Sequence, residues 1–113
     1  MSMRYISTRG AGSAAEDTAK YFCDILLEGL APDGGLFLPQ SYPVLSADEL
    51  AAMRKLRYAD LAFNIISRFA DDIPAYDLKA IIDKTYTPQI FGSSEITTVK
   101  TLVPGLHILQ LSN

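Results

Sequence analysis

The sequence has few of the residue types that build disulfide-linked or metal-centred folds. It contains one cysteine, one histidine and no tryptophan among 113 residues. A single cysteine excludes an internal disulfide framework and suits a reducing compartment. No apolar run approaches the ~20 residues needed to span a bilayer, and the amino terminus lacks a signal-peptide pattern. We therefore expect a cytoplasmic protein with no membrane partner.

The overall composition is that of an ordinary globular protein with a slight acidic excess. Hydrophobic residues make up 49% of the chain, charged residues make up 20%, and the net charge is −3. The negative charge argues against nucleic acid as the main partner. The length fits one domain, residues 1–113, with a modest core. Met3 could be the native initiator, so Met1 and Ser2 are interpreted as a cloning remnant.

A dense turn signal lies near the first third of the chain, in the sequence Leu-Ala-Pro-Asp-Gly-Gly-Leu-Phe-Leu-Pro at positions 30–39. Pro32 presets its own φ angle, Asp33 can bond its own backbone, and Gly34 and Gly35 allow a positive φ. These four residues predict a tight structural turn in which Gly34 or Gly35 has a positive φ. A very short strand over 36–38 is expected to follow.

Hydrophobic periodicity and capping residues predict about four helices. The first begins at an N-cap serine, Ser13, and ends near Gly29, with a buried apolar stripe at Ala19, Phe22, Cys23, Leu26, Leu27 and Leu30. A second, short helix begins after Ser46, whose capping-box partner is Glu49. The remaining two are expected over 58–70 and from Pro74 to about Tyr86.

β-prone residues lie at both ends of the chain. Residues 4–8 predict an N-terminal edge strand, and residues 96–103 and 106–111 flank a Pro-Gly turn signal, which indicates a hairpin. The expected fold class is therefore α+β. It is a small, mainly helical domain with about four helices, a short N-terminal strand and a C-terminal β-hairpin.

The residues that could carry chemistry are few. His107 has no cysteine or carboxylate nearby at ligand spacing, so a surface or hairpin role is expected and no metal site is predicted. Cys23 is expected in the core, and the adjacent pair Asp71–Asp72 suits helix capping or solvation. Arg9, between small residues after a strand, is placed like an anion contact, although residue chemistry alone favours a solvated loop arginine. From residue chemistry alone, no catalytic residue is identified.

Three stretches together resemble one family. Tyr5–Gly10 and Leu27–Pro39 resemble the N-terminal domain of threonine synthase, and Leu109–Asn113 is similar to the strand that leads into its cofactor-binding core. That family makes L-threonine from O-phospho-L-homoserine and water, releases phosphate, and uses pyridoxal phosphate (PLP). The motif with the family's aldimine-forming lysine would begin immediately after Asn113.

The resemblance therefore implies a non-catalytic segment that packs on the catalytic core of the same polypeptide and helps to close it. No catalytic or cofactor-binding residue is expected here, and no PLP is expected on this chain. Arg9 and Thr8 are the candidates for holding the substrate's phosphate or for domain closure; a salt bridge to Asp33 is the competing role for Arg9. The last strand, 106–111, is expected either to give self-association by pairing with another copy of the chain or to leave an apolar edge exposed. Two alternatives stay open: an interaction module derived from this domain, and a homologue that acts as a lyase on a related phosphate ester.

Overall fold

The computed structural model describes residues 2–10 and 20–111, and within them a two-stranded sheet near the amino terminus. Strand β1 (Tyr5–Ser7) pairs antiparallel with β2 (Phe37–Pro39), with Tyr5 opposite Pro39 and Ser7 opposite Phe37. On its other edge, β1 exchanges two backbone hydrogen bonds with Lys20, of 2.8 and 3.1 Å. Helix α1 (Phe22–Glu28) lies in the chain between Lys20 and β2. We call residues 2–10 and 20–39 the N-terminal unit.

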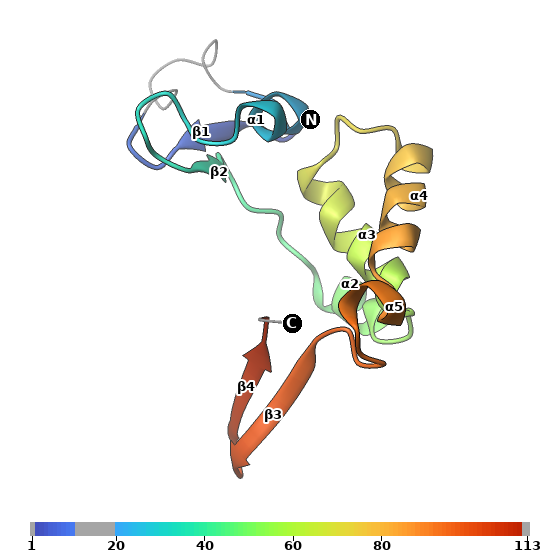
Figure 1. Ribbon diagram of the computed structural model, residues 1–113. Coiled ribbons are helices and arrows are strands. Elements are labelled where there is room, and N and C mark those ends of the chain that lie inside the picture. Colours follow the sequence, from blue (N-terminus) through green and yellow to red (C-terminus); the bar gives the residue numbers. More distant parts are fainter. Residues whose placement is uncertain (1, 11–19, 112–113) are drawn as a thin grey trace.

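Four further helices follow: α2 (Ala47–Met53), α3 (Tyr58–Phe69), α4 (Ala75–Thr85) and the single-turn α5 (Pro88–Phe91). Helices α3 and α4 pack against one another (Figure 1). A buried hydrophobic cluster, to which both helices contribute, consists of Ala70, Leu78 and Ile82, and Phe22 of α1 packs against it. The short core of the molecule is therefore shared between the helices and the N-terminal unit.

The chain ends in a hairpin of β3 (Thr98–Val103) and β4 (Leu106–Gln110). Thr98 lies opposite Gln110, the register shifts between Thr101 and Val103, and Gly105 makes the turn with φ 84°. The hairpin projects away from the helices (Figure 1), and nearly all of its side chains are exposed. Its apolar residues therefore contribute little to the core of this segment.

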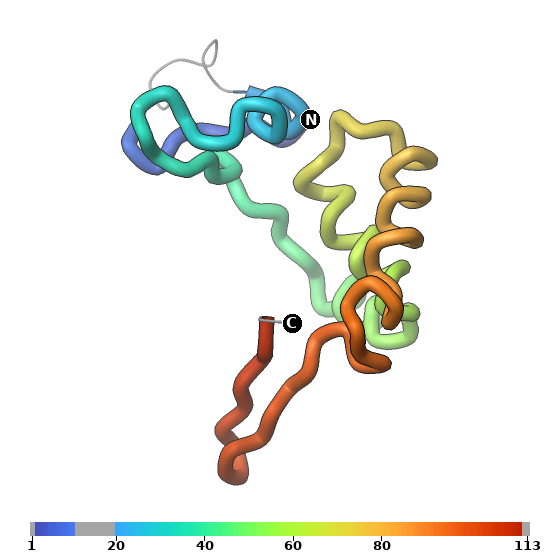
Figure 2. The backbone as a smooth tube through the Cα atoms, in the orientation of Figure 1, coloured from blue at the N-terminus to red at the C-terminus, as the bar shows by residue number. Residues whose placement is uncertain are grey.

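The described chain is extended for its length. Its radius of gyration is 16.7 Å, whereas a compact domain of this size has a value of about 13 Å. Figure 2 shows residues 40–46 running as a linker between β2 and α2. No large side chain is fully buried among the described residues.

One turn joins the N-terminal unit to the helices. Asp71 and Asp72, which we call the acidic turn, connect α3 to α4. Asp71 Oδ2 accepts a hydrogen bond from the backbone N–H of Met3 (2.7 Å), and Asp72 Oδ2 accepts one from the N–H of Cys23 (2.9 Å). Just before this turn, the carbonyl of Phe69 accepts a 2.6 Å hydrogen bond from the Tyr5 hydroxyl. Three hydrogen bonds thus fix the N-terminal unit against the end of α3.

These contacts correct the predicted first helix. In the described residues α1 begins at Phe22, because Lys20 is an extended residue bonded to β1 and Asp72 supplies the cap at Cys23. The predicted N-cap Ser13 lies outside the described residues. The predicted stripe is only partly buried: Phe22 packs on the core and Cys23 is half-buried, whereas Leu26, Leu27 and Leu30 are exposed, Leu27 to 88%.

Other predicted features are confirmed. Ser46 is the N-cap of α2: its hydroxyl accepts from the N–H of Glu49 (3.1 Å), and the Glu49 carboxylate accepts from the N–H of Ser46 (2.8 Å). The acidic turn does cap a helix, although the helix is α1 and not a neighbour in sequence. The predicted α+β class holds, with the additional short helix α5.

Candidate functional site

The loop that follows β1 lies directly against Leu36, the residue between the Pro32–Gly35 turn and β2. Thr8 donates its backbone N–H to the carbonyl of Leu36 (2.8 Å), and Thr8 Oγ1 accepts the N–H of Leu36 (3.0 Å). These bonds continue the β1–β2 pairing beyond the last strand residues. Both motifs that were singled out in the sequence therefore meet in one site, which we call the paired loops (residues 7–10 and 31–36).

The Pro32–Gly35 turn has the predicted chemistry. Gly34 has φ 83°, and its N–H donates to the carbonyl of Ala31 (2.9 Å). The carboxylate of Asp33 accepts the N–H of Gly35 at 2.9 Å, so Asp33 bonds its own turn as expected. The prediction of a positive φ is confirmed at Gly34. Gly35 is needed for a different reason, since a Cβ atom there would lie 2.4 Å from Ser7 Oγ.

Ser7 is the buried centre of the paired loops. Its side chain is only 3% exposed; Oγ donates to Asp33 Oδ1 (2.6 Å) and accepts the backbone N–H of Arg9 (3.1 Å). Sequence reasoning missed Ser7, because a single serine in a β-prone run gives no sign of a partner 26 residues away. The usable signal was its alternation with Tyr5, which places both side chains on one face of β1.

Arg9 crosses from one loop to the other. Its Nη1 donates to the main-chain carbonyl of Asp33 at 3.1 Å and lies 2.9 Å from where a Cβ on Gly34 would stand. The predicted alternative, a salt bridge from Arg9 to the Asp33 carboxylate, is wrong: the arginine bonds a neutral carbonyl, and the carboxylate is engaged by Ser7 and Gly35. Within the described residues, Arg9 forms no ion pair.

Thr8 and Arg9 place hydrogen-bond donors on the exposed rim of the paired loops. Both residues are exposed. Thr8 Oγ1 accepts one bond from Leu36, which leaves the hydroxyl hydrogen able to donate. A guanidinium beside a hydroxyl, both on a backbone that is fixed by hydrogen bonds, suits an anion such as a phosphate group.

The other candidate residues have structural surroundings. His107 lies on the exposed hairpin, where Nδ1 is 2.9 Å from Thr101 Oγ1. Cys23 lies against Asp72, whose hydrogen bond and charge, together with burial, raise the pKa of the thiol. Across residues 2–10 and 20–111, no group of three or more potential ligand residues is arranged to hold a metal ion. In the same part of the chain, no helix combines the length and apolar character needed to cross a bilayer.

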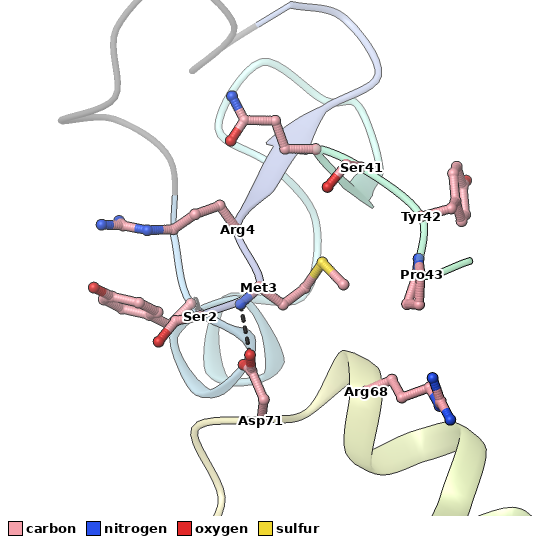
Figure 3. A pocket seen from close by; sticks show the side chains of 10 residues that line it. Ser2, Met3, Arg4, Ser41, Tyr42, Pro43, Arg68 and Asp71 are labelled. Atoms are coloured by element: carbon pink, nitrogen blue, oxygen red, sulfur yellow. Dashed lines mark hydrogen bonds between the residues drawn. The ribbon is translucent and has the colours of Figure 1, made fainter. Parts of the chain in front are cut away.

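A cavity of about 590 Å³ lies elsewhere, between the N-terminal unit and α3 (Figure 3). Its two arginines are already engaged: Arg4 stacks 4.2 Å above the ring of Tyr21, and Arg68 pairs with Glu49 at 3.0 Å. Asp71, which also lines it, holds the backbone N–H of Met3. This cavity is part of the junction described above and does not include Thr8 or Arg9.

The fold and the paired loops define the amino-terminal segment of one enzyme family. The family model described as threonine synthase N terminus matches residues 4–86, and the chain belongs to that family. This confirms the resemblance seen in the two sequence motifs, both of which lie inside the matched range.

Individual relatives agree with this assignment. Threonine synthase from Methylobacillus glycogenes is 50% identical over 98% of the chain, and that from Corynebacterium glutamicum is 46% identical over 97%. The crystal structure of PLP-bound threonine synthase from Brucella melitensis covers 97% of the chain with a TM-score of 0.78 and 34% identity. The chain spans only 24%, 23% and 22% of the lengths of these three proteins.

Proposed function

We propose that this chain is the N-terminal segment of a threonine synthase, which converts O-phospho-L-homoserine and water to L-threonine and phosphate. The observation that carries the proposal is the match of almost the whole chain to the PLP-bound enzyme from Brucella melitensis, at a TM-score of 0.78. The segment itself is non-catalytic, and its partner is the catalytic core of the same polypeptide.

PLP would be held by that core, because the lysines of this chain do not suit an aldimine. Lys20 is paired with Glu28, and Lys79 is paired with Asp60 and Asp83. The other three, Lys55, Lys84 and Lys100, are exposed. We therefore assign no residue of this segment a role in the chemistry that PLP supplies.

The segment's proposed role is to pack on the core and help to close the active site. Support comes from its shape and surface: the chain is extended, and large apolar side chains are exposed on α1, on the turn after it and on the hairpin. Such surface is costly in water, at about 25 cal/mol per Å². A segment that covers the active site would exclude water from reactive intermediates.

Arg9, assisted by Thr8, is proposed to hold the phosphate group of the substrate. The substrate brings a phosphate and also leaves it behind, so the closed site needs cations beyond those that bind the cofactor's phosphate. Arg9 is exposed, is anchored at a neutral carbonyl and forms no ion pair with the described residues. A guanidinium in this state can bind two phosphate oxygens at once.

The test uses the full-length protein, with phosphate release and threonine both measured from O-phospho-L-homoserine. Arg9→Ala should raise KM by roughly tenfold or more. Its kcat and melting temperature should change little, and Arg9→Lys should fall between the two. Arg54→Ala, at an exposed arginine that ends α2, is the matched control. Phosphate release without threonine would instead assign a related lyase, and no activity with an intact fold would favour an interaction module.

A further inference from the structure

We propose that Asp33 and Ser7 are positioning residues that hold Arg9 for its anion while keeping the Asp33 carboxylate away from the guanidinium. The inference rests on the proposed phosphate contact of Arg9 and adds the residues that make this contact possible. Neither side chain is proposed to touch substrate.

The first step concerns charge. Asp33 lies next to Arg9, since its main-chain carbonyl accepts from Nη1 at 3.1 Å. An ion pair between these neighbours would neutralise the guanidinium, and a phosphate would have to compete with the carboxylate for the same donors. Instead, Asp33 Oδ1 accepts from Ser7 Oγ at 2.6 Å and from the N–H of Gly35 at 2.9 Å. The arginine is therefore held by a neutral carbonyl and forms no ion pair with the described residues.

The second step concerns rigidity. Ser7 is 3% exposed, and its hydroxyl has a defined direction because its one proton is donated to Asp33. The lone pairs of the same oxygen accept the backbone N–H of Arg9 at 3.1 Å. Asp33 thus fixes both ends of the arginine: the backbone through Ser7, and the guanidinium through its own carbonyl. A side chain that is ordered before its ligand arrives loses less freedom on binding.

The third step concerns space. A Cβ on Gly35 would lie 2.4 Å from Ser7 Oγ, 2.9 Å from Thr8 Oγ1 and 3.0 Å from Asp33 Oδ1. The absence of a side chain at position 35 is what lets these three oxygens approach the turn. The double glycine is therefore part of the device that positions Arg9 and not only a means of reversing the chain.

A double-mutant cycle in the full-length enzyme tests this inference, with Arg9→Ala, Asp33→Ala and the double variant. The readouts are KM for O-phospho-L-homoserine, kcat, and the inhibition constant of inorganic phosphate. Asp33→Ala should raise KM and the phosphate inhibition constant together, by roughly threefold to tenfold, with kcat within about twofold. In the Arg9→Ala background, the same change should have no further effect on either constant.

Two further variants keep the result clear. Asp33→Asn retains an acceptor oxygen for Ser7 and Gly35, so it should restore KM to near the wild-type value. Ser7→Ala should raise KM and the phosphate inhibition constant as Asp33→Ala does, and it replaces Asp33→Ala in the cycle if that variant does not fold. Full additivity of either change with Arg9→Ala would overturn the positioning role alone. An Arg9→Ala enzyme with unchanged KM would overturn the phosphate contact itself, and this inference with it.

Discussion

Two adjacent glycines at the paired loops are required for different physical reasons. Gly34 has φ 83°, a conformation that costs other residues roughly 1–2 kcal/mol. Gly35 has no such angle, but a side chain there would collide with the oxygen of Ser7. One position is constrained by its own backbone and the other by its neighbours.

Alanine substitutions should separate these two effects. Gly105→Ala should cost about 1 kcal/mol from its positive φ alone, since nothing lies within 4 Å of the added carbon. Gly34→Ala should cost slightly more, because the flexible end of Arg9 must move. Gly35→Ala should cost about 1–3 kcal/mol through displacement of Ser7. Urea unfolding of the full-length protein measures all three, and a Gly35→Ala protein as stable as wild type would contradict the observed close approach.

Tyr5 should make the fold sensitive to alkaline pH. Burial, and then the charges of Asp71 and Asp72, raise its pKa from 10.0 to about 12. Between these two values the folded state keeps a proton that the unfolded chain has released, so the free energy of unfolding falls as pH rises. Tyr5→Phe should lower stability at neutral pH, because the bond to Phe69 is lost, yet its stability should decline less steeply in this window. Tyr76→Phe, at an exposed ring, is the matched control.

At the scale of elements, α1 and α2 differ in the sequence distance between the start of the helix and the side chains that cap it. The cap of α2 could be predicted because Ser46 and Glu49 are three residues apart. The start of α1 could not be predicted as readily. Asp24 accepts the N–H of Tyr21 locally (3.2 Å), but the N–H of Cys23 is capped by Asp72, 49 residues later. The same distinction explains the candidate site: the turn at Pro32–Gly35 was predictable from local chemistry, whereas Ser7 and the carbonyl contact of Arg9 depend on how two distant loops pack.

Ser46→Ala should destabilise α2 by about 1 kcal/mol, because the N–H of Glu49 loses its acceptor. Ser46→Asp should retain most of the stability, since aspartate is an equally good N-cap. Unfolding midpoints of the full-length variants give the comparison. If Ser46→Ala left the midpoint unchanged, the cap would contribute nothing in solution.

At the scale of the whole molecule, the described residues expose many large apolar side chains. Leu27 and Val44 are each 88% exposed, and the apolar residues of the hairpin lie open on both strands. The predicted stripe of the first helix was therefore real as a pattern, but its leucines do not face the core of this segment. A sequence pattern identifies an apolar face; it cannot identify which part of a longer polypeptide covers that face.

Leu27→Ala in the full-length protein tests whether the rest of the polypeptide packs on the exposed leucines of α1. If the remainder of the polypeptide packs on α1, the substitution should cost about 2 kcal/mol or more. An exposed leucine would change stability by only about 0.5 kcal/mol. Lys84→Ala, at an exposed polar position on α4, serves as the matched control. Equal small effects for both variants, measured by denaturant unfolding, would show that Leu27 is exposed to solvent in the full-length protein.

The segment by itself should form no specific covalent adduct with PLP. Lys20 and Lys79 are paired with carboxylates, and the other lysines are exposed on α4, on the turn after α2 and on the hairpin. Borohydride reduction of a mixture with PLP, followed by peptide mass spectrometry, should show only scattered, substoichiometric labelling. Stoichiometric labelling of one lysine would contradict this expectation.

The acidic turn also sets an order of events during synthesis. Strand β1 can pair with β2 once residue 39 has emerged from the ribosome, but Met3, Tyr5 and Cys23 bond to residues between Phe69 and Asp72. At about 5–20 residues per second, those partners follow roughly two to six seconds later. Throughout that interval the small sheet has nothing to dock on. The nascent chain thus leaves Phe22 of α1 exposed until residues 70–82, on which it packs, have emerged.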